Sequence, residues 1–327
     1  MKAFVTGATG FLGGALVRAL RARGDEVVAL VRDSSRASAL DARIVEGDLA
    51  DRSRLAEQMR GCDAVFHVAA MYEVGIPRSR RPAMYDANVR GTQNAVDAAV
   101  EAGAARIVYV STINAFGNTH GRVVDETYER RGGDYVSYYD ETKHLAHLAA
   151  RERIERGAPV VIVQPGAIYG PGDHSELGAQ LDQARAGKLK FLALADVGVN
   201  AVHVDDVAAG MLLAHDRGRL GEAYVLGGEI TRLRELVAIV SRQAGRRPPR
   251  LELPAALVKL MIPFGPLVGR AMGTGPNLRE LIAAAHGVTY WASDAKACGT
   301  LGYEPRSLED GLRTLGGRNG AADRAAL

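Results

Sequence analysis

Cysteine is nearly absent from this chain of 327 residues, which has only Cys62 and Cys298. The two lie far apart and outside any C-x-x-C spacing, which argues against a disulfide framework and against a structural zinc site. So little cysteine is typical of a reducing compartment, and we expect both residues to be buried as small apolar side chains. The chain also opens on an apolar strand and a glycine turn, unlike a signal peptide, so the expected location is the cytoplasm.

An excess of one charge sign is also missing. The chain has 41 Lys and Arg against 38 Asp and Glu, a net charge of +3, and neither sign forms a long block. Nucleic-acid-binding domains usually carry a basic stripe or patch. We therefore expect a small-molecule partner and no nucleic acid.

Long apolar runs are scarce. The nearest is residues 253–272, LPAALVKLMIPFGPLVGRAM, which Lys259, Arg270 and three prolines interrupt. A membrane-spanning helix needs about 20 predominantly apolar residues. No membrane span is expected, and we interpret this run as a buried or lid-like segment, with peripheral membrane contact as the alternative.

Six short runs rich in β-branched residues alternate with helix-like stretches in the first half of the chain. They are residues 2–6, 26–31, 43–47, 64–69, 106–111 and 160–164. The runs are almost continuously apolar, as in parallel strands that helices cover on both faces. This pattern predicts an α/β protein with a doubly wound parallel sheet of the Rossmann type and a smaller C-terminal substrate-binding region. We assign residues 1–170 to the dinucleotide-binding domain, with 190–226 returning to it, and 171–327 mainly to the substrate-binding region.

A glycine-rich turn, TGATGFLGG, follows the first strand and precedes a helix-like stretch. Glycine allows a sharp turn and close approach of a ligand to the backbone, and the positive end of the helix favours a phosphate. A tight strand-to-helix turn needs glycine for its own sake, but the strand before it and the helix and strand after it favour a dinucleotide site. The predicted cofactor contacts in this turn are Gly7, Thr9, Gly10, Phe11, Leu12 and Gly13.

The second strand ends at Val31 and is followed by Arg32. NAD-binding folds usually have an acidic residue there for the ribose hydroxyls, whereas an arginine can hold a 2′-phosphate bidentately. We therefore predict NADP as the cofactor. Asp33 keeps NAD open, and Arg32 as an ordinary loop residue is the structural alternative.

Three tyrosines precede Lys143 in the segment DYVSYYDETK. We predict a helix over residues 135–156, on which residues three or four apart share a face. Tyr139 lies four residues before Lys143, whereas Tyr135 and Tyr138 have no lysine in that position. A nearby ammonium can lower the pKa of a phenol by roughly 1–3 units. Tyr139 is therefore the predicted acid/base, with Lys143 as its partner and as a ligand of the cofactor ribose.

Hydroxyl side chains, Ser111 and Thr112, end the fifth strand run. A hydroxyl at the carboxyl edge of a parallel sheet can hydrogen-bond a developing alkoxide. The structural alternative is a hydroxyl that only satisfies loop backbone. Two further residues on the Tyr139 helix, His144 and His147, could suggest a metal pair, but without a third ligand we expect two solvated histidines and no metal site.

Several short motifs together resemble the extended short-chain dehydrogenase/reductase superfamily, which includes the NAD-dependent epimerases and dehydratases. They are TGATGFLG, GDL, HVAA, NVRGT, VST, YDETK, QPGAIYGPGD and VHVDDVA, in this order, and LGYEPRSLEDGL resembles the closing segment of the family. The resemblance implies a Rossmann fold, an NAD(P) cofactor and hydride transfer. It also implies that Tyr139 is the proton donor and acceptor, with Lys143 as its partner and Thr112 as the hydroxyl residue. Ser111 is the alternative to Thr112.

Further cofactor contacts are implied by the same resemblance. Asp48 would face the adenine, the alanines would line the path of the cofactor, Asn88 would lie near the ribose and Pro165 would abut the nicotinamide. Asp48 and Asn88 could instead cap helices. The complete set of these positions is Asp48, Leu49, Ala69, Ala70, Asn88 and Pro165.

The chain departs from two branches of the family. Nucleotide-sugar members usually carry RYFN where this chain has QPGA and an arginine where it has Val199, and dehydratases have Asp-Glu where it has Ile113 and Asn114. The remaining resemblance is to the branch of dihydroflavonol reductases and 3β-hydroxysteroid dehydrogenases. It implies an NADP-dependent carbonyl reductase or secondary alcohol dehydrogenase for a small, hydrophobic substrate.

Two other functions are the alternatives. One is a nucleotide-sugar epimerase with no net cofactor turnover, and the other is a non-catalytic NADP-sensing protein.

The residues expected to wall the substrate pocket are Met71, Tyr72, Asn114, Phe116 and His174. We also expect a homodimer, because the helices around residues 88–104 and 135–156 have small or apolar faces of the kind that such proteins pair.

Overall fold

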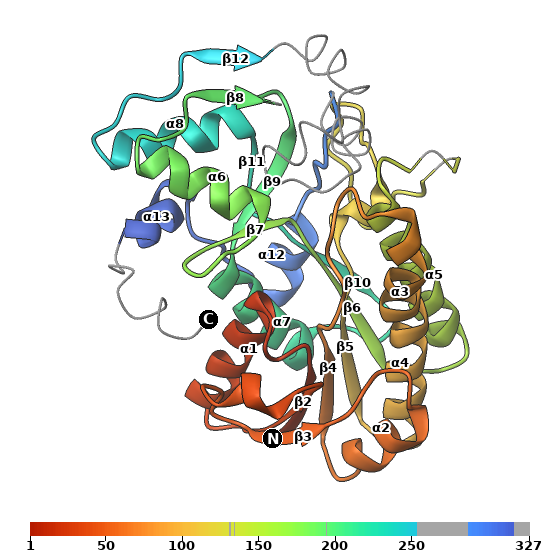
Figure 1. The fold of residues 1–327 in the computed structure, drawn as a ribbon. Coiled ribbons are helices and arrows are strands. Elements are labelled where there is room, and N and C mark those ends of the chain that lie inside the picture. The colour runs from red at the N-terminus through yellow and green to blue at the C-terminus, as the bar shows by residue number, and fades with distance from the viewer. Residues whose placement is uncertain (131, 134, 194, 254–286, 317–327) are drawn as a thin grey trace.

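The central element is a seven-stranded parallel sheet in the order β10-β6-β5-β4-β1-β2-β3 (Figure 1). In this computed structural model, residues 1–130, 132–133, 135–193, 195–253 and 287–316 are described, so the apolar run expected to be lid-like lies outside them from residue 254 on. The strands are β1 Lys2–Thr6, β2 Glu26–Val31, β3 Arg43–Glu46, β4 Ala64–His67, β5 Arg106–Val110, β6 Val160–Pro165 and β10 Ala223–Leu226. The predicted doubly wound sheet is confirmed.

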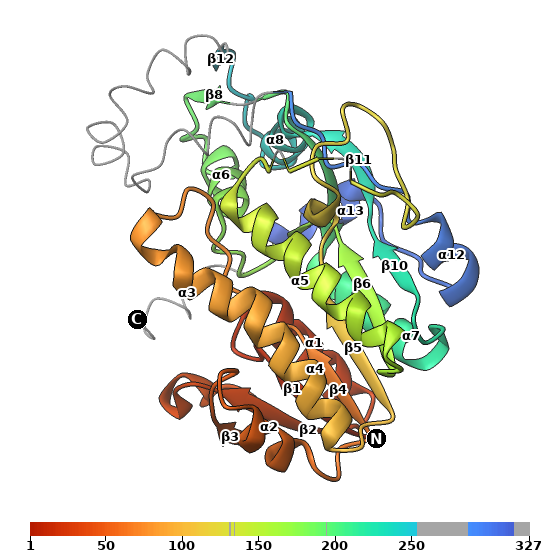
Figure 2. The same ribbon diagram turned by 90° about the vertical axis from the view of Figure 1, so that its right-hand side faces the viewer.

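Helices cover both faces of this sheet. One face carries α1 (Phe11–Ala22), α7 (Val204–Arg217) and α12 (Ala295–Leu301), and the other carries α2 (Arg52–Met59), α4 (Gly91–Glu101) and α5 (Tyr138–Glu155). Alternate strand residues pack into the two cores, with Phe66 on the α1 side and Val65 on the α4 side. Figure 2 shows α4 and α5 side by side across their face of the sheet.

A smaller region lies beyond the carboxyl edge of the sheet (Figure 1). It contains the three-stranded sheet β11-β9-β7 and the pair β12-β8, together with α6, α8 and α13, whose apolar residues form a core of their own. Its elements are β7 Ala167–Tyr169, α6 Glu176–Arg185, β8 Phe191–Ala193, β9 Gly198–His203, β11 Glu229–Arg232, α8 Leu233–Gln243, β12 Leu251–Leu253 and α13 Leu308–Arg313. Because β10 belongs to the central sheet and α7 packs on α1, the chain returns to the first region between its visits to the second.

Short helical turns complete the described chain. They are η1 Ser34–Ala37, η2 Arg78–Arg80, α3 Arg81–Tyr85, the π-helical turn η3 Asp86–Arg90, η4 Ile113–Phe116 and η6 Thr314–Gly316. Among the described residues, no helix has both the length and the apolar composition that a membrane span requires.

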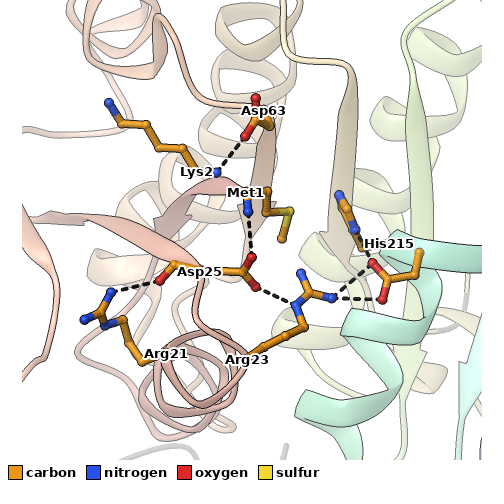
Figure 3. A network of polar contacts seen from close by, with 8 residues as sticks. Met1, Lys2, Arg21, Arg23, Asp25, Asp63 and His215 are labelled. Carbon is orange, nitrogen blue, oxygen red and sulfur yellow. Dashed lines mark hydrogen bonds and ion pairs between the residues drawn. The ribbon is translucent and has the colours of Figure 1, made fainter.

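A polar network fixes the amino end of the sheet (Figure 3). The amino group of Met1 and the guanidinium of Arg23 both donate to the carboxylate of Asp25, at 2.8 and 2.5 Å. Arg23 also donates to Asp216 of α7 at 2.9 Å. Burial alone would raise the pKa of Asp25, but these bonds outweigh it and lower the pKa below its usual value. The network holds α1 against α7 at the end of the sheet remote from the carboxyl edge.

Candidate active site

The glycine turn between β1 and α1 has the shape that a dinucleotide phosphate requires. Gly7 has φ of +72°, and a Cβ on it would lie 2.7 Å from the backbone nitrogen of Ala69. A Cβ on Gly13 would lie 2.0 Å from the carbonyl oxygen of Gly7. Gly10 is exposed and caps α1 without a side chain, and the first turn of the helix has no acidic residue. The backbone amides at this helix start are therefore open to an anion, and the residues present fit a pyrophosphate.

A buried chain of hydrogen bonds starts beside this turn. The amides of residues 68–69 donate to Thr6 Oγ1, which in turn donates to His67 Nδ1 at 2.8 Å. The ring of His67 donates from Nε2 to Thr92 Oγ1, which donates to the carbonyl of Asn88 at 2.7 Å. Burial lowers the pKa of His67 to about 3, so this histidine is neutral. This series of hydrogen bonds connects the strand that precedes the glycine turn with the π-helical turn η3.

Asn88 anchors the loop that follows β4. Its side chain is buried, accepts from the amide of Met71 at 2.7 Å, and donates to the Met71 carbonyl and to Thr142 Oγ1, both at 3.0 Å. Asn88 is thus not a helix cap. It lies within the helical stretch that η3 continues, and its side-chain amide connects the loop after β4 with Thr142 of α5. The carboxylate of Asp48 accepts a hydrogen bond from the amide of Ala50 at 2.8 Å, and the residue that caps α2 is Asp51. The helix-cap alternative is therefore wrong for both residues.

Helix α5 carries Tyr139 and Lys143 on one buried face. The helix begins at Tyr138, because Ser137 caps it by accepting from the amide of Asp140 at 3.1 Å. The predicted start at Tyr135 is three residues too early, so Tyr135 does not share a helix face with Tyr139. The register of Tyr139 and Lys143, four residues apart on the helix, is as predicted.

Lys143 is held at the carboxyl edge of the sheet. Its side chain is 4 % exposed, and its ammonium donates to the carbonyl of Val110, the last residue of β5, at 3.0 Å. The ammonium also lies 5.5 Å from the ring centre of Tyr109. Burial lowers the pKa of Lys143 to about 8. Val110 is the one acceptor that the described residues offer this ammonium, so two of its three hydrogens are available for a ligand.

The phenol of Tyr139 makes no hydrogen bond with any residue that the structure describes. Its ring is 9 % exposed and meets the ring of Tyr72 edge to face at 4.9 Å between centres. Burial, and then the neighbouring Tyr72, raise the pKa of Tyr139 well above that of a free phenol. The prediction that Lys143 lowers the pKa of Tyr139 is wrong for the protein without a ligand, because the ammonium is hydrogen-bonded to the carbonyl of Val110 and the ring of Tyr139 is buried.

The two hydroxyl residues after β5 point to different partners. Thr112 Oγ1 accepts from the amide of Asn114 at 3.2 Å and lies 3.3 Å from Asn114 Oδ1. Ser111 Oγ lies 3.0 Å from Nδ1 of His147 on α5. Thr112 is therefore hydrogen-bonded to Asn114 of the turn η4, whereas Ser111 is hydrogen-bonded to His147 of α5.

The prediction of two solvated histidines on α5 is wrong. His144 Nδ1 lies 3.0 Å from the carbonyl of Ala115, and His147 bonds Ser111. Burial lowers the pKa of His147 to about 4. This helix face packs on the end of β5 and on η4, which is why both rings find partners there. Within the described part of the chain, no group of three or more His, Cys, Asp or Glu side chains could hold a metal ion.

A buried carboxylate, which the sequence did not single out, lies next to Tyr139. Asp140 is 1 % exposed, and its carboxylate accepts from Asn114 Nδ2 at 3.0 Å and from the hydroxyl of Tyr290 at 2.8 Å. Burial raises its pKa. The contacts connect Thr112, through Asn114 and Asp140, with the helix that bears Tyr139. Tyr290 comes from a segment 150 residues away, and no local pattern indicated it.

The remaining predicted pocket residues are placed unevenly. Met71 and the largely exposed Tyr72 lie on the loop after β4, and Asn114 joins the network of Asp140. Phe116 instead packs in a buried cluster with Ile113 and Val124, and His174 is exposed beyond β7.

The remaining predicted cofactor residues lie around the carboxyl edge of the sheet. Pro165 is buried at the end of β6, Ala69 and Ala70 follow β4, and Leu49 packs against the core of the α4 face. Cys62 is buried as expected, whereas Cys298 is exposed on α12, so that prediction is wrong for the second cysteine.

A model of the NAD-dependent epimerase/dehydratase family matches residues 3–227. The chain belongs to this family. It is thus an NAD(P)-dependent enzyme of the extended short-chain dehydrogenase/reductase type, as the motifs predicted.

Relatives over nearly the whole chain carry reductase names. A protein of Synechocystis sp., provisionally named dihydroflavonol 4-reductase, is 34% identical over 94% of this chain and 92% of its own. The 2-alkyl-3-oxoalkanoate reductase of Stenotrophomonas maltophilia is 31% identical over 96% of this chain and 98% of its own. Among solved structures, that of gox2253 has a TM-score of 0.83 at 35% identity and covers 96% of both chains. These names support an oxidoreductase.

Proposed function

We propose that the protein is an NADP-dependent carbonyl reductase or secondary alcohol dehydrogenase for a small, hydrophobic substrate. The observation that carries the proposal is the phenol of Tyr139, which is buried, unbonded within the described chain and one helical turn from Lys143. The family alone supports either a reductase or an epimerase, because both move a hydride and a proton.

The chain would hold the dinucleotide at the carboxyl edge of the sheet. The amides around Gly10 would bind the pyrophosphate, Arg32 the 2′-phosphate, and the two free hydrogens of the Lys143 ammonium the ribose hydroxyls. NADP, when bound, supplies or accepts the hydride.

Tyr139 would move the proton. Its pKa is raised by burial, so the neutral phenol is the form at neutral pH, and a neutral phenol can donate to a substrate carbonyl. Thr112, whose hydroxyl donates to Asn114 Oδ1 in the structure, would turn this hydrogen to the same substrate oxygen as negative charge develops there. In the oxidative direction the same two groups would act in reverse.

The residues near Tyr139 suit a substrate with apolar or ring-shaped parts. The edge-to-face partner Tyr72 is 55% exposed, and Met71 packs in the same cluster. The carboxylate of Asp140 is buried and covered by Asn114 and Tyr290, so a ligand would not contact it directly. We infer an apolar ketone as the substrate class, in line with the name of the 2-alkyl-3-oxoalkanoate reductase relative.

A screen of ketones, aldehydes and alcohols with NADPH or NADP at 340 nm tests this function. We expect net change of the cofactor with alkyl or aryl ketones. If no carbonyl compound changes the absorbance while a nucleotide sugar is interconverted, the epimerase alternative is correct and the proposal fails.

We expect Arg32→Ala to raise the Kd for NADP by about 10- to 100-fold, the size of one lost charge-assisted interaction. Arg32 is exposed and makes no ion pair with a described residue, whereas Asp33 accepts from the amide and hydroxyl of Ser35 at 3.0 and 2.6 Å. The Kd for NAD should stay the same. Fluorescence titration measures both constants, with Arg43→Ala as the control. Equal Kd values for NADP and NAD in the unmodified protein would contradict the assignment.

The proposal also covers assembly, domain division and location. We propose a homodimer through α4 and α5, where Gln93, Leu145 and the exposed Leu148 border an open cavity together with Tyr85 of α3 and Val89 of η3. A mass of one chain by light scattering would refute it. Residues 1–170 with 190–226 would form the cofactor domain, apart from the short strands β7, β8 and β9 that lie in the smaller region, and the rest would form mainly the substrate region. Two free cysteines support a reducing compartment, the cytoplasm.

A further inference from the structure

Two basic stretches far apart in the sequence lie together at one end of the molecule. Residues 185–191 and 242–251 contain seven Lys and Arg and no Asp or Glu. The two stretches are neighbours because β8 pairs with β12 and because a Cβ on Gly187 would lie 3.3 Å from Cδ of Arg246. In Figures 1 and 2, β8 and β12 occupy the end of the molecule opposite β3. We call these two stretches the basic edge.

The charges of the basic edge are not neutralised by the described part of the chain. None of the seven basic side chains forms an ion pair with a described residue, and six of them are exposed. The adjacent Glu252 is paired with Arg234 at 3.4 Å. Arg185 and Arg242 lie in the last turns of α6 and α8, where a cation also stabilises the helix dipole. The other five have no such local role. They are Lys188, Lys190, Arg246, Arg247 and Arg250.

Two large apolar side chains are exposed at the ends of the two stretches, next in sequence to Lys190 and Arg250. Phe191 and Leu251 are partners in the register of β8 and β12, and they are 37% and 57% exposed. An exposed apolar pair that adjoins several Lys and Arg matches the interface of a bilayer, where apolar side chains enter the headgroup boundary and cations meet lipid phosphates. A nucleic acid would use the cations but would leave Leu251 without a partner.

We propose that the basic edge docks on the surface of a membrane that contains anionic lipids. The interaction is peripheral, through Phe191, Leu251 and the cations of the basic edge. It does not depend on the proposed catalytic function, because none of these residues belongs to the candidate active site.

Vesicle co-sedimentation of the full chain tests the proposal. Binding is expected to vesicles of phosphatidylcholine with 30% phosphatidylglycerol, to be weak on phosphatidylcholine alone, and to fall as NaCl is raised. Reversal of three charges should weaken binding at least about 100-fold, since each neutralised cation alone accounts for about fivefold. The variant is Lys188→Glu with Lys190→Glu and Arg246→Glu.

A matched control separates this edge from net charge. Arg43→Glu with Arg60→Glu and Arg219→Glu changes the charge equally at other exposed positions, and vesicle binding should fall by less than about tenfold. Phe191→Ser with Leu251→Ser should also weaken binding, including in high salt, where the cations contribute little. Equal loss in the two charge variants, or binding of RNA by the basic edge without vesicle binding, would overturn the proposal. Unchanged circular dichroism and Tm in every variant show that folding is intact.

Discussion

Tyr139→Phe is expected to lower kcat for carbonyl reduction by about 10²- to 10⁴-fold, the range for loss of a positioned general acid. The Kd for NADP should change by less than about twofold, because the predicted cofactor contacts of Lys143 and the glycine turn remain. The ring packs with Ile76 and Met84, and phenylalanine keeps that packing. Steady-state kinetics at 340 nm and a cofactor titration measure the two effects separately.

The neighbouring tyrosines supply matched controls for this variant. Tyr138→Phe removes a phenol of the same helix, and Tyr72→Phe keeps the edge-to-face ring contact with Tyr139. Both should retain kcat within about fivefold, because neither hydroxyl is assigned a proton to transfer. A Tyr139→Phe variant with full activity would refute the acid/base assignment, and one that loses NADP binding would indicate a structural role instead.

The fold and the register of Tyr139 and Lys143 could be predicted because both depend on short-range periodicity. Apolar runs such as residues 64–69 specify buried parallel strands, and the spacing of Tyr139 and Lys143 follows from 3.6 residues per turn. The glycine turn is equally local, because Gly7 and Gly13 contact each other across six residues.

The parts that sequence reasoning missed depend on contacts between distant segments. The histidines of α5 looked solvated because their partners, Ser111 and the carbonyl of Ala115, lie some 30 residues earlier. The pKa of Tyr139 was expected to fall because the carbonyl that holds Lys143 and the burial of the ring were not visible in the pattern. The basic edge could not be predicted for the same reason. Each of its two stretches is short, and only the pairing of β8 with β12 brings them together.

Asp140 is expected to position Thr112, the proposed hydrogen-bond donor to the substrate, through a contact between distant segments. With its carboxylate turned to Nδ2 of Asn114, the Oδ1 atom of Asn114 faces Thr112 Oγ1. Asp140→Asn leaves one acceptor oxygen where the carboxylate has two and removes the charge, so Asn114 and Tyr290 compete for that oxygen and the bond that orients Asn114 is weakened. We expect kcat/KM to fall by about 10- to 100-fold, which corresponds to about 1.5–3 kcal/mol for a hydrogen bond to a charged group. A larger change in kcat than in KM would distinguish positioning of Thr112 from loss of substrate binding.

The exchange of the two side chains is the decisive control for Asp140. In Asn114→Asp with Asp140→Asn, the amide and the carboxylate change places, so the bond between them is again one between an amide and a charged carboxylate, and Tyr290 can still donate to residue 140. Recovery of kcat/KM to within about fivefold of the unmodified protein is expected, because the bond that orients residue 114 toward Thr112 is restored. Tyr290→Phe leaves that bond in place and should cost less than either single variant. If Asp140→Asn retains full kcat/KM, or if the exchange restores Tm but not kcat/KM, Asp140 supports the fold and does not position Thr112.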